Sequence, residues 1–170
     1  MKRFLLFLFA LALLCTGVTA QTAAYRTDRN IAYRDAAGDG YVDSLCRLDI
    51  YYPTDAKGFP TVVWFHGGGL TGGRRDIPQA LCDKGFAVVG VDYRLAPRVK
   101  VADCVEDAAA AAAWVVRNIA SYGGDPELIF IAGHSAGGYL TSMIGLDKRW
   151  MAPYGIDPDT AFAALIPYSG

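Results

Sequence analysis

Apolar residues along this chain form short continuous runs, separated by longer stretches in which they recur at helical spacing. The runs lie at 61–65, 86–91, 128–132 and 162–166. The first two are rich in β-branched and aromatic residues, which predicts strands buried on both faces of a sheet. Helical spacing follows at 101–120, where six consecutive alanines allow close packing on a sheet, and again up to Leu146. This alternation predicts an α/β fold with a mostly parallel sheet and flanking helices.

The segments around the first run have weaker patterns. Residues 31–33 predict a short edge strand, and polar and apolar residues alternate over 45–52. Alternation is typical of a strand with one exposed face, so Asp49 is expected in solvent at the antiparallel rim of the sheet. Pro78 and Gly85 are suitable for the start and the end of one further short helix.

The run at 128–132 leads directly into Gly-His-Ser-Ala-Gly at 133–137. This pattern predicts a strand, a sharp turn and a helix, with Ser135 at the apex of the turn. Gly133 and Gly137 meet the need for small residues, because a Cβ atom there would collide with strand or helix backbone. The turn holds the Ser135 hydroxyl beside unpaired N–H groups of the first helical turn, including that of Ala136.

A second glycine turn, His66 followed by three glycines at 67–69, ends the run at 61–65. In an open α/β sheet both turns lie at the carboxyl ends of strands, where ligands bind. Backbone N–H groups in such a turn can face a negatively charged oxygen, as the tetrahedral intermediate of acyl transfer requires. The two turns together indicate a site for nucleophilic acyl transfer.

Four linked segments resemble the α/β-hydrolase superfamily, in its carboxylesterase and hormone-sensitive-lipase-like branch. They are His-Gly-Gly-Gly at 66–69, Asp-Tyr-Arg-Leu-Ala-Pro at 92–97, Tyr-Gly-Gly-Asp-Pro at 122–126 and Gly-His-Ser-Ala-Gly-Gly at 133–138. The resemblance covers about residues 45–170. It implies Ser135 as nucleophile and Gly67, Gly68 and Ala136 as the donors of an oxyanion hole. It also implies a small carboxylic ester as substrate and no cofactor.

The sequence after the serine does not supply a complete set of catalytic groups. In α/β-hydrolases an acidic residue and then a histidine follow the nucleophile in the sequence. This chain has no histidine after Ser135 and offers three aspartates there, Asp147, Asp157 and Asp159. The resemblance therefore implies that residues 21–170 are the N-terminal portion of a longer hydrolase domain, truncated before the later strands. The chain alone is expected to be inactive.

Three other interpretations use the same residues. Gly67, Gly69 and Gly72 follow a strand, and Asp92 lies about twenty residues on, which mimics a dinucleotide-binding fingerprint. In that fingerprint the third glycine opens a helix, whereas here a loop is expected to continue. A non-catalytic α/β-hydrolase-like binding module would not need Ser135. A serine peptidase would use the same nucleophile.

Neither histidine is predicted to activate the serine. His134 adjoins Ser135 and is expected to point elsewhere on the turn. His66 is expected to order the glycine loop by hydrogen bonding. Tyr139, in the following helix, is expected to pack against the protein and not to contact substrate.

The charged residues nearby are expected to be structural. Asp92 and Arg94 are expected to form an ion pair or to bind backbone, and a solvated helix face is expected at Asp103, Glu106 and Asp107. Cys46, Cys82 and Cys104 match no zinc-binding spacing, so no metal is expected, and buried single thiols are the favoured interpretation.

The N-terminus has the pattern of a signal peptide. Lys2 and Arg3 precede an apolar stretch at 4–14, which is too short to span a bilayer, and small residues follow at 18–20. We expect a signal peptide at 1–20, a mature start near Gln21, a secreted or periplasmic protein, and no membrane span in the mature chain. The net charge of −1 gives no reason to expect nucleic acid or an anionic membrane as partner.

Overall fold

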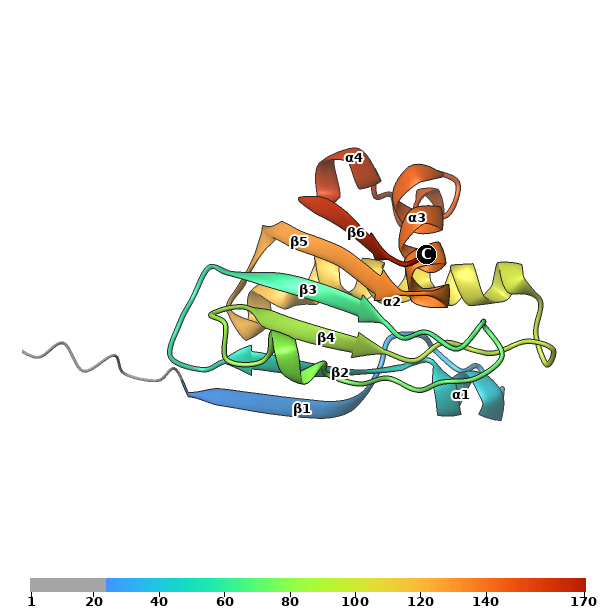
Figure 1. Cartoon of the computed structure of the whole chain (residues 1–170), viewed down its shortest axis with the longest axis horizontal. Helices are drawn as coiled ribbons and strands as arrows, with labels where there is room; N and C mark the ends of the chain where they lie inside the picture. The colour runs from blue at the N-terminus through green and yellow to red at the C-terminus, as the bar shows by residue number, and fades with distance from the viewer. Residues whose placement is uncertain (1–23) are drawn as a thin grey trace, which may run out of the picture.

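The computed structural model describes residues 24–170, and a six-stranded sheet runs through them (Figure 1). Strands β3, β4, β5 and β6 are parallel, while β2 is antiparallel to both β1 and β4. The strand order is β1 (Tyr25–Ala32), β2 (Arg47–Pro53), β4 (Ala87–Val91), β3 (Phe59–Phe65), β5 (Gly124–His134) and β6 (Ala164–Tyr168). The predicted mostly parallel sheet is confirmed, and so is an edge strand near residue 31, but that strand is longer than predicted and runs over Tyr25–Ala32, without Tyr33. The signal peptide and the start at Gln21 lie outside the described residues and stay predictions.

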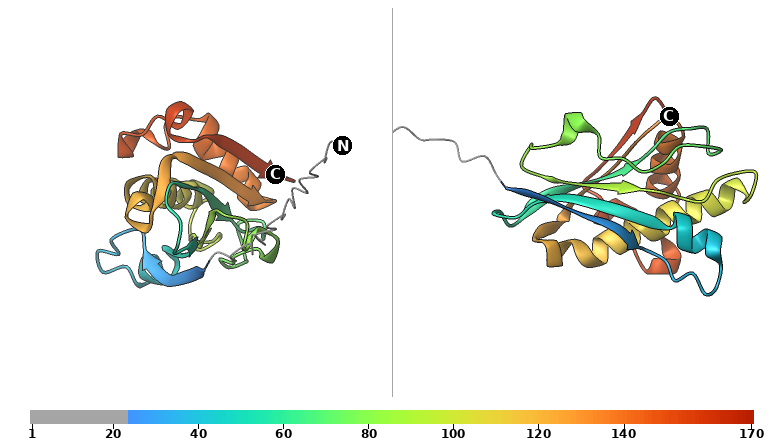
Figure 2. Two further views of the ribbon diagram at one scale, coloured as in Figure 1. Left: turned by 90° about the vertical axis from the view of Figure 1, so that its left-hand side faces the viewer. Right: turned by 90° about the horizontal axis from the view of Figure 1, so that it is seen from below.

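The longest helix, α2, covers one face of the sheet, and the loop after β3 covers part of the other (Figure 2). The helices are α1 (Gly40–Leu45), α2 (Val101–Tyr122), α3 (Ala136–Leu146) and α4 (Pro158–Ala161). The prediction of a helix between Pro78 and Gly85 is wrong. Only a 3₁₀ turn forms there, at Gln79–Leu81, and Asp83 then takes a positive φ of 58°, which a continuing helix does not allow. None of the helices in residues 24–170 is both long and apolar enough to cross a membrane.

Helix α2 forms the centre of the core. All six alanines from 108 to 113 are buried, because small side chains let the helix approach the sheet and α3 closely. The helix begins after Lys100, whose N–H donates to the Asp103 carboxylate at 2.8 Å. It ends at Gly123, which has the left-handed φ of 98° common at helix C-termini.

Two predictions about strand burial need correction. Strand β4 is buried throughout, as expected, but Val62 and Trp64 of β3 are only half-buried. The reason is that the loop after β3 lies against β4 at Gly90 and covers only part of that face of the sheet (Figure 2). On β2, Asp49 is 8% exposed and does not lie in solvent, since basic side chains cover it.

The strand register brings three chain segments to one edge of the sheet. Phe65, the last residue of β3, pairs with Val91 of β4 and with Gly133 of β5. The residues that follow these strands therefore leave the sheet side by side. They are His66, Asp92 and Ser135, and all the candidate catalytic groups lie at this edge.

Candidate active site

Ser135 occupies the turn between β5 and α3 with φ 54° and ψ −117°. A positive φ is uncommon for a residue other than glycine, and such backbone strain is often found at functional sites. Two hydrogen bonds hold the turn. The Ser135 N–H donates to the Tyr168 carbonyl at 2.9 Å, and the Ser135 carbonyl accepts from the Tyr139 N–H at 3.0 Å. The turn is thus fixed on one side by β6 and on the other by α3.

The glycines beside the serine are required by close backbone approach. A Cβ atom on Gly133 would lie 2.4 Å from the Gly137 carbonyl carbon and 2.8 Å from the Phe65 carbonyl oxygen. Gly137 is equally crowded by the end of β3. The prediction that both positions must be small is confirmed.

The Ser135 hydroxyl is left available for chemistry. It does not cap α3, although serine is a preferred capping residue, and within residues 24–170 it has no hydrogen-bond partner. The Ala136 N–H, at the start of α3, likewise has no acceptor in the described part of the chain. A half-buried hydroxyl therefore lies next to an unpaired helix-terminal donor.

The loop after β3 passes directly beside this serine. A Cβ atom on Gly67 would lie 3.4 Å from the Ser135 Cβ and 3.1 Å from the His134 carbonyl oxygen. Gly68 has φ 117°, and a Cβ there would lie 2.2 Å from the Gly72 carbonyl oxygen. The two glycine turns that the sequence singled out are thus brought into contact.

Hydrogen bonds fix the orientation of two peptide groups in this glycine loop. The His66 ring bonds the Gly67 carbonyl oxygen through Nδ1 at 2.7 Å, and since a carbonyl only accepts, Nδ1 carries the proton. The Gly68 carbonyl accepts from the Thr71 and Gly72 N–H groups, both at 3.1 Å. Because the peptide group is planar, fixing the Gly67 carbonyl also fixes the Gly68 N–H, which points the opposite way. The prediction that His66 orders the loop is confirmed.

A hollow of about 320 Å³ opens beside the serine. It is lined by Gly69, Leu70, Ser135, Ala136, Tyr139, Ser169 and Gly170. Tyr139 is 38% exposed and forms part of its wall, so it is less buried than the predicted packing role implies. The signal was available in the sequence, because a residue four positions after Ser135 lies on the same face of a helix.

Neither histidine is placed to activate Ser135. The exposed His134 ring lies against Tyr168, with ring centroids 5.5 Å apart. The buried His66 ring stacks on Tyr93 at 4.4 Å and is engaged by the loop. The absence of a hydrogen bond from either ring to the Ser135 hydroxyl agrees with the prediction from the sequence.

Asp92 and Arg94 do not pair with each other, but the alternative that was predicted, contact with backbone, is found for Asp92, whose carboxylate accepts from the Arg75 N–H. Asp92 pairs with Arg75, and Arg94 donates to Asp107 through Nε at 2.7 Å and through its backbone N–H at 3.0 Å. Asp107 also pairs with Arg34 and is fully buried, so it does not belong to a solvated helix face. A buried carboxylate requires such charge-assisted partners.

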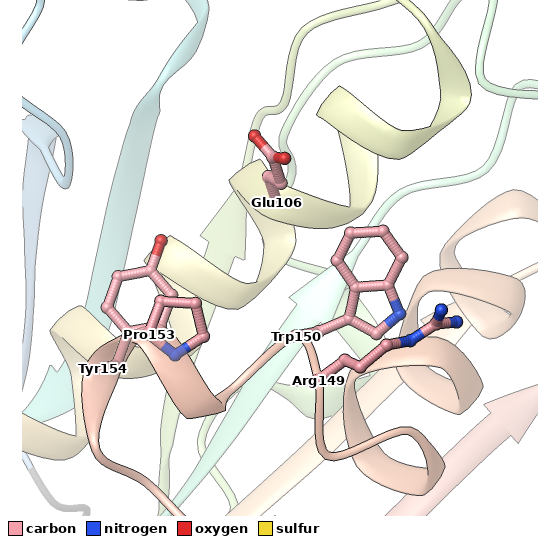
Figure 3. A pocket seen from close by; sticks show the side chains of 5 residues that line it. All are labelled: Glu106, Arg149, Trp150, Pro153 and Tyr154. Atoms are coloured by element: carbon pink, nitrogen blue, oxygen red, sulfur yellow. The ribbon is translucent and has the colours of Figure 1, made fainter.

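A second hollow of about 320 Å³ lies near the other end of α3 (Figure 3). Its lining residues are Glu106, Arg149, Trp150, Pro153 and Tyr154. Glu106 is exposed, as predicted, and Arg149 is bound to Asp147 at 2.8 Å. Among the described residues its lining includes no serine, threonine or cysteine, and it is not the candidate for catalysis.

The cysteines and acidic residues form no metal site in the described range. No group of three potential metal ligands comes together within residues 24–170. Cys46 and Cys104 are buried free thiols, as predicted, but Cys82 is only half-buried. The dinucleotide-binding interpretation fails on the backbone, since Gly72 lies within a loop and opens no helix.

Comparison with known proteins agrees with this geometry. Residues 48–158 match the family described as BD-FAE. The chain belongs to this family, among the hormone-sensitive-lipase-like carboxylesterases of the α/β-hydrolase superfamily. It is 33% identical over 155 residues to the probable carboxylic ester hydrolase LipM of Mycobacterium tuberculosis, covering 86% of this chain and 35% of LipM.

Solved esterases have the same fold. Esterase B from Lactobacillus rhamnosis superimposes with a TM-score of 0.68 at 26% identity, covering 83% of this chain and 46% of that one. The hyperthermophilic esterase of Pyrobaculum calidifontis gives a TM-score of 0.63 at 35% identity, covering 78% of this chain and 42% of that one. The chain thus spans less than half the length of these relatives.

Proposed function

We propose that this chain carries the nucleophile and the oxyanion hole of a serine esterase that cleaves small carboxylic esters. The observation that carries the proposal is the approach of the glycine loop to Ser135, with a Gly67 Cβ position 3.4 Å from the serine Cβ. A strained, uncapped serine beside unpaired backbone donors is the arrangement that acyl transfer requires. The similarity to esterases supports the same reaction class.

The reaction follows from these groups. The Ser135 Oγ attacks the ester carbonyl carbon while a base accepts its proton, and the N–H groups of Gly67, Gly68 and Ala136 stabilise the oxygen that becomes negative. The carbon–oxygen bond to the alcohol then breaks, and the alcohol leaves with the proton. Water attacks the resulting acyl-enzyme in the same way, which releases the acid and restores Ser135. No cofactor takes part in these steps.

The base and its acidic partner are proposed to come from a segment that follows Gly170 in the complete protein. The reason is that the described part places no histidine within hydrogen-bonding distance of the Ser135 hydroxyl. A serine hydroxyl is a weak nucleophile without such a base. Residues 1–170 expressed alone are therefore expected to show no appreciable ester turnover.

The test uses the complete protein and short-chain p-nitrophenyl esters. Ser135→Ala should lower kcat by several orders of magnitude. Ser142→Ala is the matched control, because Ser142 lies in α3, the helix that follows Ser135, and its hydroxyl donates to the Gly138 carbonyl at 3.1 Å. Retention of most of the wild-type rate by Ser135→Ala would reject the proposal and favour a binding module. Faster turnover of matched amides than of esters would favour a peptidase.

We also propose that the protein is exported, on the basis of the charged and apolar pattern at residues 1–20. The mature chain should begin at Gln21. Intact-mass measurement of protein from a secretion-competent host decides this. Cys15 lies within this segment, and lipidation at that cysteine is the alternative form of export. A mass that still includes the N-terminal segment, or a chain that begins at a lipidated Cys15, would overturn the proposal.

A further inference from the structure

Arg75 lies on the part of the glycine loop that returns toward the sheet, and it bonds three other segments. Its backbone N–H donates to the Asp92 carboxylate at 2.5 Å, and its guanidinium donates to the same carboxylate. The guanidinium also donates to Asp49 at 3.0 Å and to the Asn30 side-chain oxygen at 3.2 Å. One side chain therefore ties the loop to β1, to β2 and to the end of β4.

The two carboxylates depend on this arginine. Asp49 and Asp92 are 8% and 6% exposed, and buried charge is costly unless it is paired and hydrogen-bonded. The other arginine near Asp49 is Arg29, whose side chain is 72% exposed and whose contact is longer, at 3.4 Å. Arg75 has the planar, multiple-donor group that can serve both carboxylates at once.

The returning part of the loop also fixes the candidate oxyanion donors. Thr71 and Gly72 hold the Gly68 carbonyl, and Gly73 lies against Gly67 so closely that a Cβ atom there would be 2.4 Å from the Gly67 carbonyl oxygen. Arg75 comes two residues after Gly73. Its bonds therefore anchor the end of the segment on which the Gly67 and Gly68 peptides rest.

A second effect passes through His66. The Asp92 carboxylate lies 3.7 Å from the His66 Nε2, while His66 Nδ1 must keep its proton to bond the Gly67 carbonyl. Asp92 thus lies between Arg75 and the ring that bonds the Gly67 carbonyl. Without Arg75, nothing in the described part of the chain ties this carboxylate, and the His66 ring beside it, to the returning loop through a side-chain ion pair.

We propose that Arg75 is a positioning residue of the ester-cleaving site, which holds the Gly67 and Gly68 donors in place through Asp92, Asp49 and the returning loop. This inference rests on the proposed esterase function. Arg75 itself makes no contact with substrate in this role. Its loss should therefore act on the transition state, through misplaced donors, more than on the binding of the ester.

The experiment compares Arg75→Met with Arg74→Met in the complete protein. Arg74 is the adjacent residue, is exposed, and has no hydrogen bond or ion pair in the described part of the chain, so the change in charge is matched. Arg75→Met should lower kcat by about 10- to 100-fold, in keeping with the cost of a donor misplaced by about 1 Å. KM should change by less than about threefold, and Arg74→Met should leave both constants unchanged.

Two further measurements separate positioning from a general structural effect. The affinity for a trifluoromethyl ketone, which forms a tetrahedral adduct with the serine, should fall in proportion to kcat, whereas affinity for the carboxylate product should not. Arg75→Lys should recover part of kcat, because lysine restores a charge but not the planar set of donors. If Arg75→Met does not fold, the comparison with Arg74→Met is made with Arg75→Lys instead.

The outcomes are distinct for this inference and for the function on which it rests. An inactive wild type, or an active Ser135→Ala variant, would reject the esterase function. An active wild type with equal kcat in the folded Arg75→Met and Arg74→Met variants would reject only the role of Arg75. A fall in product affinity equal to the fall in ketone affinity would also reject it.

Discussion

A Cβ atom on Gly137 would lie 2.0 Å from the carbonyl oxygen of Phe65. The first turn of α3 therefore rests directly on the end of β3. This contact places Ser135, at the start of α3, beside the loop that begins at His66. The candidate nucleophile Ser135 and the candidate donors Gly67 and Gly68, about 70 residues earlier in sequence, are thus brought together by backbone packing in which Gly137 takes part.

We expect Gly137→Ala to lower the free energy of unfolding by about 1–3 kcal/mol or more, the usual cost of overpacking. The clash is with backbone, which cannot move aside as a flexible side chain could. Gly40→Ala is the control, because nothing lies within 4 Å of a Cβ there and the residue is helical. It should leave stability unchanged or increase it slightly. Urea unfolding of the complete protein measures both, and equal stabilities would contradict the packing described.

Gly68→Ala should reduce kcat more than it affects KM. An added Cβ would meet the Gly72 carbonyl at 2.2 Å and push the loop away from its position beside Ser135. Loss of one oxyanion donor costs about 10²–10³ in kcat. Gly58→Ala provides the matched control, since Gly58 also has a positive φ, of 68°, but has no atom near its Cβ position. If the two folded variants hydrolyse esters at the same rate, the loop does not supply the donors.

Asp107→Asn should destabilise the protein by about 3–5 kcal/mol, because removing one member of a buried ion pair leaves uncompensated charge. Here the charges left behind are those of Arg34 and Arg94. Glu106→Gln, one residue earlier on the same helix but exposed, should cost less than about 0.5 kcal/mol. Thermal or urea unfolding measures the difference, and a similar small effect for both variants would show that Asp107 is not a buried anchor.

The Cys46 thiol should make stability depend on pH in the alkaline range. Burial raises the pKa of Cys46 from 9.0 to about 11, so the native state keeps the proton between these values while the unfolded chain releases it. Stability is unaffected below pH 9 and falls as pH rises through this window, by on the order of 1 kcal/mol at pH 10. Cys46→Ala should remove this part of the decline. Identical pH dependence in wild type and variant between pH 8 and pH 10.5 would contradict the prediction.

The sequence alone determined the central strands, the two long helices α2 and α3, and the shape of the serine turn. All of these depend on local properties. The strands at 61–65 and 86–91 follow from continuous apolar runs, and the turn follows from the collision that any Cβ at 133 or 137 would cause. The helix α1 was missed although its cap is local, since Asp39 accepts from the Tyr41 N–H at 2.8 Å.

Tertiary structure alone decided the partners of the charged side chains. Asp107 meets Arg34 across 73 positions of sequence, and Asp92 meets Arg75, not its near neighbour Arg94. It also decided that a loop, not a helix, covers the outer face of β4, where the absence of a side chain at Gly90 leaves room for the Asp76 carbonyl. Periodicity records which residues are apolar along one element. It contains no information on which charges meet once separate elements pack, because that depends on distances set by the whole sheet.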